Sequence, residues 1–450
     1  MFTSVSEAIL LKHGLRSDRI WTSKFLYRSI FRHIPLFLDT YVLMKSQYWS
    51  RERIERIQDE RLKDLFHHVT HVPYWRDVFN TAGVDASMSP REILSKLPVT
   101  LKKALVGKRM DYITDASLLA KSDPDYTSGS TGKPFHFLQD WHASLRSFAV
   151  TERIFRSTGK RFPIVYMRAR PRNGFTFYRH VWFYIRGYNS IRHRVNDFKE
   201  LGRQLRKGFI LYGYTSWVVE LARQMEKLGI ELPVRVAMVA GEHLTESDRA
   251  YVERVMKTEL FTLYASREVG FLGYECELHN MHISEEWAYV EVVDENNLPL
   301  PPGREGRILV TTFDNRVMPF IRYEIGDTGV MTDSLCACGR TLRTLTFKGR
   351  TTELIELEDS RTVSLLDIAY ALGSYRDSIR QYQIIQTGKV SFVMKVVPGS
   401  SFDAHKESLD ALMVRLLHPR VRIQWELTGT IPEAKSGKAV YFIRDFENKS

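Results

Sequence analysis

The chain carries the stretch Tyr126-Thr127-Ser128-Gly129-Ser130-Thr131-Gly132-Lys133-Pro134, which sets two glycines, four serine or threonine hydroxyls and one lysine within nine residues. Glycine lets backbone N–H groups approach an anion closely, hydroxyls add rotatable donors, and lysine adds a positive charge. The stretch therefore predicts a loop that holds the phosphates of a nucleotide such as ATP. The alternative is a solvated turn, because serine, threonine and glycine are common turn residues.

The spacing within this stretch excludes the Walker phosphate loop. A Walker loop places four residues between its glycines and follows its lysine with a serine or threonine that holds magnesium. Here two residues separate Gly129 from Gly132, and Pro134 follows Lys133. A phosphate loop at this position therefore belongs to another class of nucleotide-binding protein.

Length and composition are those of a soluble globular protein with two or three domains: 450 residues, 44% hydrophobic and 26% charged. The longest apolar stretch near the N-terminus, residues 34–44, contains Pro35 and Asp39 and is too short to span a bilayer. The first twenty residues lack the continuous apolar segment of a signal peptide. We therefore expect a cytoplasmic protein without a transmembrane segment. Residues 25–49 are expected either to pack on the main domain as helices or to lie as an amphipathic helix pair on a membrane or on another subunit.

Positive charge is concentrated in residues 151–207, where fifteen lysines and arginines stand against three acids. This interval accounts for the whole net charge of +12, so the rest of the chain is neutral overall. It also carries aromatic residues, among them Phe175, Phe177, Tyr178, Trp182, Phe183 and Tyr184. Such a run indicates an anionic partner, such as a nucleotide or a phosphorylated acceptor, with a solvated surface as the alternative. Nucleic acid is not expected, because the run shows no recognition motif.

Short β-rich segments alternate with helical ones along the chain, as an α/β fold requires. We expect one helix over residues 51–80 and another over residues 245–258, with Thr245 as its N-cap. Strands are expected at residues 235–240, 261–264, 290–293 and 306–311. After Arg350 a small α+β module is expected, with strands at 382–385 and 391–397 and a helix at 405–417.

The glycine spacing of the loop resembles the phosphate-binding loop of the acyl-adenylate-forming (ANL) ligases. The branch in question contains phenylacetate:CoA ligase and the CapK-like capsule-biosynthesis proteins. Residues 65–79, with His-Val-Pro-Tyr-Trp at their centre, and Leu97-Pro98-Val99-Thr100 resemble the N-terminal part of that branch. Because further segments follow in the family's order, the resemblance covers most of the chain.

This resemblance implies an α/β fold with a small second domain. Residues 1–349 would form a large AMP-binding adenylation domain of several subdomains, mainly helical over residues 1–95. Residues 350–450 would form a mobile α+β C-terminal lid. Enzymes of this family join a carboxylate to the α-phosphate of ATP, release pyrophosphate and use Mg²⁺.

Two downstream segments resemble parts of the family's nucleotide site. Ala240-Gly241-Glu242 resembles the segment that lines the adenine and acyl pockets, which assigns Gly241 and Glu242 to ATP binding. Tyr264-Ala265-Ser266-Arg267-Glu268, expected at a strand end, resembles the family's aromatic-Gly-x-Thr-Glu segment. The resemblance implies that Tyr264 stacks on adenine, that Ala265 and Ser266 border the nucleotide, and that Glu268 holds Mg²⁺. The residues that would hold pyrophosphate are Ser128, Gly129, Ser130, Thr131, Gly132 and Lys133.

Two residues of the second segment depart from the family. Ala265 replaces the usual glycine, and Arg267 occupies the position of a hydroxyl residue that contacts the α-phosphate. Arginine can contact a phosphate with two hydrogen bonds, so Arg267 is kept as a candidate catalytic residue.

Three further segments complete the family's site. Arg322-Tyr323-Glu324-Ile325-Gly326-Asp327 is similar to the Tyr-x-x-Gly-Asp segment, so Asp327 would accept the ribose hydroxyls. Gly349-Arg350 resembles the Gly-Arg at the domain junction, where Arg350 would also reach ribose. Residues 431–438 resemble the Pro-x-x-x-x-Gly-Lys loop, whose lysine bridges the carboxylate and the α-phosphate. Lys438 is therefore the predicted catalytic lysine.

The three cysteines suggest a metal site in a reducing compartment. Cys276 precedes His282 by six residues, and Cys336 and Cys338 follow within a Cys-x-Cys-Gly-Arg run. Three thiolates and one imidazole form a closed tetrahedral set for a structural zinc, and several members of the branch look similar here. His279 is the alternative fourth ligand, and three ordinary buried thiols are the alternative interpretation.

The acid and the acceptor are less constrained by the sequence. Phe175, Tyr212, Tyr214 and Trp217 suit an aromatic or other apolar acid, although core packing explains each of them equally well. CoA is the default acceptor, and interval 151–207 could receive its phosphates, a carrier-protein arm or a phosphorylated sugar. Residues 356–362 lack the Arg-Gly that the family uses for thiolation. Two alternatives follow: transfer to an amine or hydroxyl in capsule polysaccharide or secondary-metabolite biosynthesis, or a catalytically impaired scaffold protein.

Overall fold

The computed structural model describes residues 38–85, 87–127, 135–157, 164–167, 189–191, 207–351, 354–359, 361–434 and 437–446. The predicted phosphate loop Ser128–Lys133 lies outside the described residues. So does most of the basic interval 151–207, including Phe175 and the other five aromatic residues named for it above. Among the helices of the described ranges, none combines the length and the apolar character that crossing a membrane would need.

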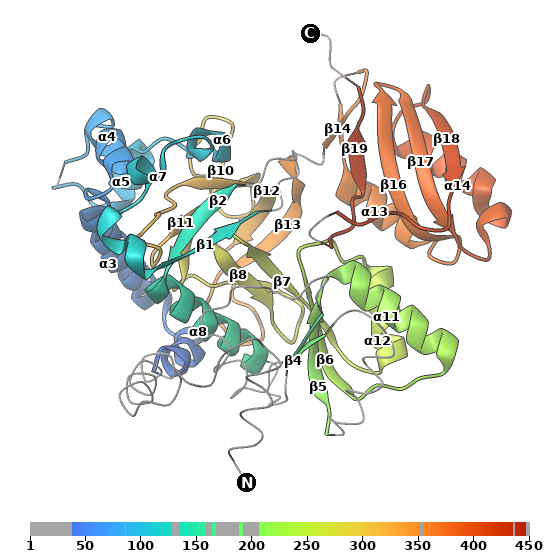
Figure 1. The fold of residues 1–450 in the computed structure, drawn as a ribbon, viewed down its shortest axis with the longest axis horizontal. Helices are drawn as coiled ribbons and strands as arrows, with labels where there is room; N and C mark the ends of the chain where they lie inside the picture. The colour runs from blue at the N-terminus through green and yellow to red at the C-terminus, as the bar shows by residue number, and fades with distance from the viewer. Residues whose placement is uncertain are drawn as a thin grey trace, which may run out of the picture.

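A large mixed sheet forms the centre of the molecule, with α3 and α8 on one side and α11 and α12 on the other (Figure 1). Its strands are, in spatial order, β10 (Ala288–Val293), β11 (Glu305–Thr312), β12 (Tyr323–Thr332), β13 (Thr344–Arg350), β9 (Met281–Ile283), β8 (Gly270–Glu275), β7 (Leu260–Ser266), β6 (Val234–Ala240), β5 (Phe209–Gly213), β3 (Ile164–Met167) and β4 (Asn189–Ile191). Neighbours from β4 to β7 pair in parallel, and all other neighbours pair antiparallel. The predicted strands and the predicted α/β fold class are confirmed.

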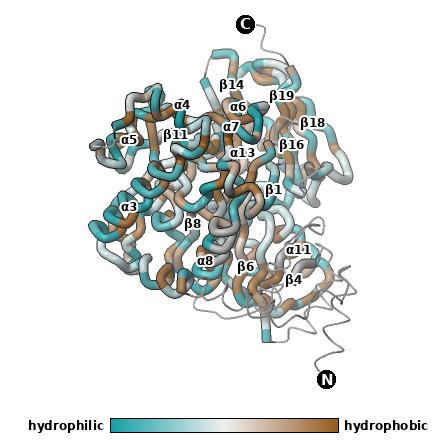
Figure 2. The backbone as a smooth tube through the Cα atoms, turned by 60° about the vertical axis from the view of Figure 1, so that its left-hand side comes forward, coloured by the Kyte–Doolittle hydropathy of each residue, from teal (hydrophilic) through white to brown (hydrophobic). Residues whose placement is uncertain are grey.

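The helix predicted over residues 51–80 is two helices, α3 (Arg51–Val69) and α4 (Pro73–Thr81). Proline disfavours helical geometry at the residue before it, and Val72 is extended with φ −93° and ψ 116°. Ser50 caps α3 by accepting the N–H of Arg53. In Figure 2 the tube of α3 alternates between hydrophilic and hydrophobic residues, as expected for a helix with one buried face.

The phosphate-loop segment connects the two strands of a small antiparallel pair, β1 (Ser122–Tyr126) and β2 (His136–Asp140). The N–H of Thr127 donates to the carbonyl of Phe135 at 2.9 Å, so the two ends of the segment lie close together. Further helices of this part are α5 (Pro90–Lys96), α6 (Lys102–Leu105), α7 (Met110–Ile113), η2 (Ala116–Lys121), α8 (Trp141–Ser157), α11 (Thr215–Leu228) and α12 (Glu246–Met256). Thr245 caps α12 as predicted, because its hydroxyl accepts the N–H of Asp248.

Residues 354–446, called the C-terminal unit below, form a second sheet with its own core and lie beside α11 and α12 (Figure 1). Its strand order is β18 (Arg422–Leu427), β17 (Ser391–Pro398), β16 (Ile379–Gly388) and β19 (Phe442–Arg444). Its other elements are α13 (Leu365–Gly373), α14 (Phe402–Leu416) and the hairpin β14 (Leu354–Glu356) with β15 (Thr362–Ser364). The predicted α+β module is therefore present. The boundary at residues 349–350 and the mobility of the unit stay predictions.

Candidate functional site

Three parallel strands end side by side, and the residues that follow them form the candidate site. Tyr214 follows β5, Gly241 and Glu242 follow β6, and residues 264–268 close β7. Gly241 has φ +81°, a conformation that favours glycine. A Cβ added there would lie 3.1 Å from the Nζ of Lys438. Ligands of open α/β sheets bind at this edge, so the geometry places Lys438 where a substrate is expected.

Lys438 reaches this edge from the C-terminal unit, and several predicted residues surround its charge. Burial, followed by the positive charge of Arg350, lowers the pKa of Lys438 from its ordinary value. The carboxylates of Glu242, Asp327 and Glu268 oppose that shift. The structure thus brings together five residues that lie far apart in the sequence.

Asp327 is a buried carboxylate that joins two other predicted residues. The antiparallel register of β12 and β13 places Asp327 opposite Arg350, whose Nε donates to Oδ1 at 3.1 Å. The hydroxyl of Tyr264 on β7 donates to Oδ2 at 2.8 Å. Burial, with the charge of Asp327, raises the pKa of Tyr264 well above its ordinary value, so the phenol stays a donor. Their contacts with adenine and ribose stay predictions.

The sequence did not predict two aromatic side chains near the site, Phe347 beside Tyr264 and His243 beside Phe347. The ring of Phe347, on β13, lies 6.0 Å from that of Tyr264 and 5.4 Å from that of His243. His243 directly follows Glu242, and Phe347 precedes Gly349-Arg350 by two residues. Their closeness in sequence to the family-like segments at 240–242 and 349–350 was the feature that could have indicated them.

Glu268 lies beside a lysine that was also missed. The hydroxyl of Ser266 donates to Oε2 of Glu268 at 3.1 Å, and the Nζ of Lys102 lies 3.8 Å from Oε1. The same Nζ donates to Oγ1 of Thr127 at 2.8 Å, directly before the phosphate-loop segment. Lys102 follows the Leu97–Thr100 segment by two residues, and this proximity was its only signal in the sequence.

Arg267 lies at the entrance to the phosphate-loop segment. Its guanidinium is 3.3 Å from the carboxylate of Asp125 and 5.8 Å from the ring centroid of Tyr126. Ala265 pairs with Phe271 of β8 within the sheet. The predicted contact of Arg267 with an α-phosphate stays a prediction, as does the bordering role of Ala265 and Ser266.

The four proposed metal ligands converge from three separate segments. One ligand atom each from Cys276, His282, Cys336 and Cys338 lies within 4.8 Å of the others. His282 uses Nδ1 to contact the carbonyl of Leu342 at 2.8 Å, which leaves Nε2 facing the Sγ of Cys338 at 3.3 Å. This donor set and tautomer fit a tetrahedral zinc.

His279, the alternative ligand, lies apart from this cluster. Its ring stacks on Phe261 with centroids 5.4 Å apart, and its Nδ1 contacts Arg249 and Glu275. The geometry therefore favours His282 as the fourth ligand.

Backbone N–H groups already point at the thiol sulfurs. The N–H groups of Leu278 and Arg340 lie 3.4 and 3.5 Å from the Sγ atoms of Cys276 and Cys338. Such donors stabilise thiolates, which are the form that binds a metal. The cluster therefore resembles a metal site more closely than a set of unrelated buried thiols.

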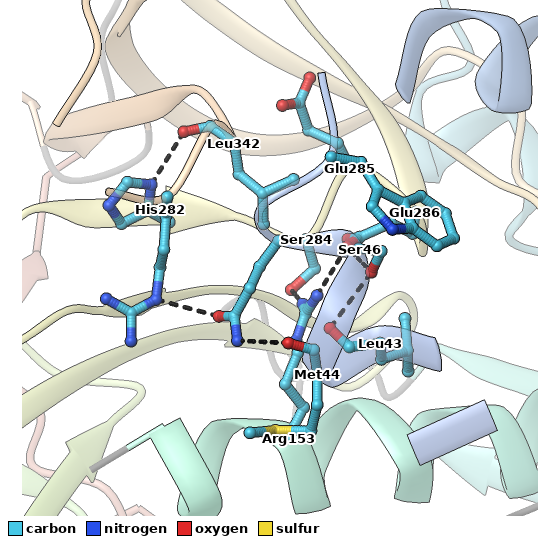
Figure 3. Close-up of polar contacts among 12 residues, drawn as sticks. Leu43, Met44, Ser46, Arg153, His282, Ser284, Glu285, Glu286 and Leu342 are labelled. Carbon is cyan, nitrogen blue, oxygen red and sulfur yellow. Dashed lines mark hydrogen bonds and ion pairs between the residues drawn. The ribbon is translucent and has the colours of Figure 1, made fainter. Parts of the chain in front are cut away.

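A buried polar network lies next to the cluster (Figure 3). Arg153 extends from α8 and donates to Glu286 at 2.9 Å and to Ser284 at 2.8 Å. The hydroxyl of Ser46 also donates to Glu286, which ties helical residues 38–46 to the main sheet. A buried carboxylate needs such partners, so this network is structural.

The aromatic residues considered for the acid fall into two groups. Tyr212 packs with Phe155 and Phe271, with ring centroids 5.9 and 6.2 Å apart. Tyr214 packs on Trp217 at 4.7 Å, and both lie where α11 meets the C-terminal unit. The first group packs against the main hydrophobic core, and a role of either group in an acid pocket stays a prediction.

Known proteins similar to the chain were found by sequence and by structure. No protein-family model matches it. A phenylacetate-coenzyme A ligase from Thermus thermophilus is 28% identical over 357 residues, which cover 74% of this chain and 78% of the relative. A phenylacetate-coenzyme A ligase from Aromatoleum evansii is 26% identical over 398 residues, which cover 82% and 88%.

Solved structures share the fold at lower identity. A 2-hydroxyisobutyryl-CoA ligase in the postadenylation state, in complex with R3-HIB-AMP, matches with a TM-score of 0.73 at 18% identity over 89% of this chain and 91% of that one. The same ligase in the thioesterification state, in complex with 2-HIB-AMP and CoA, matches with 0.58 at 19% identity over the same shares. By sequence the chain is therefore similar to phenylacetate-coenzyme A ligases, and it shares its fold with a solved 2-hydroxyisobutyryl-CoA ligase.

Proposed function

We propose that the chain is an ATP-dependent ligase that activates a carboxylic acid as an acyl-adenylate and then transfers the acyl group, by default to CoA. The observation that carries this proposal is the position of Lys438 beside Gly241 at the end of β6, with Asp327 of β12 and Arg350 of β13 close enough to affect its pKa. The phenylacetate-coenzyme A ligases among the relatives support the same reaction class.

Adenylation requires two anions to approach each other. A carboxylate oxygen forms a bond to the α-phosphorus of ATP, and pyrophosphate leaves with the electron pair of the broken P–O bond. The ammonium of Lys438 supplies positive charge at this point without transferring a proton. Asp327 and Arg350 would orient the ribose. The Ser128–Lys133 loop would hold the leaving pyrophosphate, and Lys102 donates to Thr127, which directly precedes that loop in the sequence.

Glu268 is the proposed protein ligand of Mg²⁺. Its carboxylate lies at the strand edge between the hydroxyl of Ser266 and the ammonium of Lys102. Carboxylate oxygen suits this hard cation, which when bound would neutralise phosphate charge. For zinc, the Cys276, His282, Cys336 and Cys338 set provides four protein ligands, so the ion would be structural.

The packing favours an aromatic or otherwise apolar acid. Phe155, Tyr212 and Phe271 form an aromatic cluster next to β7, and Tyr264 packs against the same core. An apolar acid would gain hydrophobic contact there while its carboxylate faces Lys438. We place this reaction in the cytoplasm, with the basic interval 151–207 available to an anionic acceptor.

The pH dependence of adenylation should reflect Lys438. Because burial lowers the pKa of Lys438, the ammonium loses its proton, and with it its charge, at a lower pH than an exposed lysine does. We therefore expect pyrophosphate exchange to fall on the alkaline side at a pH below 10.5, the ordinary lysine value. In the Lys438→Arg protein, the remaining activity should fall only at a higher pH, because guanidinium stays charged where the lysine has lost its proton. A pH–rate profile that is the same in both proteins would contradict the assignment.

One observation favours a different acceptor. The turn between β14 and β15 contains Glu358, Asp359 and Arg361, in a segment without the expected Arg-Gly. Arg361 is paired with Asp359 at 2.7 Å, and Arg420 with Glu358 at 2.7 Å. Because both acids are paired with arginines, the missing Arg-Gly itself is the feature that favours an amine or hydroxyl acceptor, as in capsule polysaccharide biosynthesis.

Carboxylate-dependent exchange of labelled pyrophosphate into ATP tests the proposal. A panel of aromatic, aliphatic and hydroxy acids should contain at least one that supports exchange. Adding CoA and looking for AMP and a thioester then separates CoA from the amine or hydroxyl acceptors. Absence of exchange with every acid, in folded and metal-replete protein, would instead favour the scaffold hypothesis.

A further inference from the structure

The carboxylate of Glu242 joins two parts of the molecule through backbone N–H groups. One oxygen accepts the N–H of Ser216 at 2.8 Å, in the first turn of α11. The other accepts the N–H of Ala439 at 2.9 Å, the residue directly after Lys438. The start of α11 lacks a side-chain cap from Tyr214, so Glu242 satisfies a donor that helix geometry leaves free.

Further contacts hold the loop of residues 431–438, which carries Lys438, against the start of α11 and the end of β6. The indole N–H of Trp217 donates to Oε1 of Glu433 at 2.8 Å. The Nζ of Lys438 lies 5.4 Å from the ring centroid of Tyr214 and, as described, against Gly241. The loop is therefore held on both sides of the catalytic lysine.

We propose that Glu242 is a positioning residue that docks the C-terminal unit and thereby sets the ammonium of Lys438 at the strand edge. This inference rests on the proposed function only for its kinetic consequence, because the docking itself is a property of the fold. Both carboxylate oxygens of Glu242 are occupied by backbone donors, so its side chain serves the loop rather than the nucleotide.

The charge of Glu242 suits this task. Hydrogen bonds from N–H groups to a carboxylate are stronger than those between neutral groups, and Glu242 also attracts the nearby ammonium of Lys438. A glutamine of the same shape would keep one acceptor oxygen, lose the other and lose the negative charge. The isosteric substitution therefore weakens docking with little change in packing.

The contact of Glu242 with Ala439 requires one particular arrangement of the C-terminal unit relative to the main sheet. The chain matches the postadenylation state of the solved 2-hydroxyisobutyryl-CoA ligase with a TM-score of 0.73, against 0.58 for its thioesterification state. Since the two states come from the same ligase, the difference reflects how the parts are arranged. Docking by Glu242 should accordingly favour adenylation, and it must be released before a different arrangement forms.

Glu242→Gln tests the inference with two independent readouts. Amide hydrogen exchange of the peptide around Ala439 should become about tenfold faster, as expected when one charge-assisted hydrogen bond is lost. The kcat of pyrophosphate exchange should fall about tenfold or more, with an unchanged KM for ATP. Glu426→Gln is the matched control, because Glu426 pairs with Lys395 inside the C-terminal unit and should change neither readout.

A second variant keeps the test decisive if Glu242→Gln folds poorly. Trp217→Phe removes the N–H donor to Glu433 but keeps an aromatic ring, and it should also speed exchange around Ala439. A raised KM for ATP with unchanged amide protection would make Glu242 a nucleotide ligand and overturn the inference. If wild-type protein shows no pyrophosphate exchange, the proposed function fails, while amide protection still decides whether Glu242 docks the loop.

Discussion

Replacing Lys438 by alanine is expected to lower the rate of acid-dependent pyrophosphate exchange by about 10²–10³-fold, the usual cost of removing one group that stabilises charge in a transition state. The reason is its position: the ammonium is the part of the C-terminal unit that lies against Gly241, within the field of Asp327, Arg350 and Glu268. Without it, two anions must approach each other with less compensating charge.

Steady-state exchange measured at saturating ATP and acid checks this expectation. Lys406→Ala is the matched control, since Lys406 pairs with Asp410 on α14 and does not belong to the candidate site. The control should keep the wild-type rate. A Lys438→Ala protein that exchanges pyrophosphate normally would remove Lys438 from the catalytic machinery.

Loss of the proposed zinc should have the largest effect on stability. Cys338→Ser is expected to lower the free energy of unfolding by about 4 kcal/mol or more, a size typical of a lost metal site. Cys276 follows β8, His282 lies on β9, and Cys336 and Cys338 lie near the start of β13, so the ion would join segments that are up to about sixty residues apart. Without it, closely spaced thiols and a buried imidazole would lose their common partner.

Elemental analysis and thermal unfolding, each with and without a chelator, measure this effect. His282→Ala and His279→Ala form a matched pair, because His282 lies in the cluster and His279 lies outside it. The first should lose zinc and the second should keep it. Protein purified without chelator that contains no zinc would exclude the site.

Local features of the fold were predictable because they depend on neighbouring residues. Thr245 caps α12 through an N–H three residues away, and β6 shows as an apolar run because both of its faces are covered. The break at Pro73 was missed, since the apolar spacing of residues 51–80 continues across it. There, proline geometry prevailed over hydrophobic periodicity.

The sequence motifs predicted which residues belong to the site, but they did not predict which of these residues contact one another. The register that pairs Asp327 with Arg350 and the bond from Tyr264 to Asp327 depend on how three strands are aligned. Lys102 and Glu268 are far apart in the sequence, so no local sequence pattern predicts that they lie close together. For the same reason, the backbone contacts of Glu242 with Ser216 and Ala439 became visible only in three dimensions.

The ion pair between Arg51 and Glu285 has a consequence for synthesis on the ribosome. Its two residues are 234 positions apart, and Gln47 similarly reaches Tyr274 across 227. At about 5–20 residues per second, Arg51 waits roughly 10–50 s for its partner to be made. During that time Leu43, buried in the finished protein, has no main sheet to cover it. The emerging chain should therefore present this segment to chaperones until most of its length has been translated.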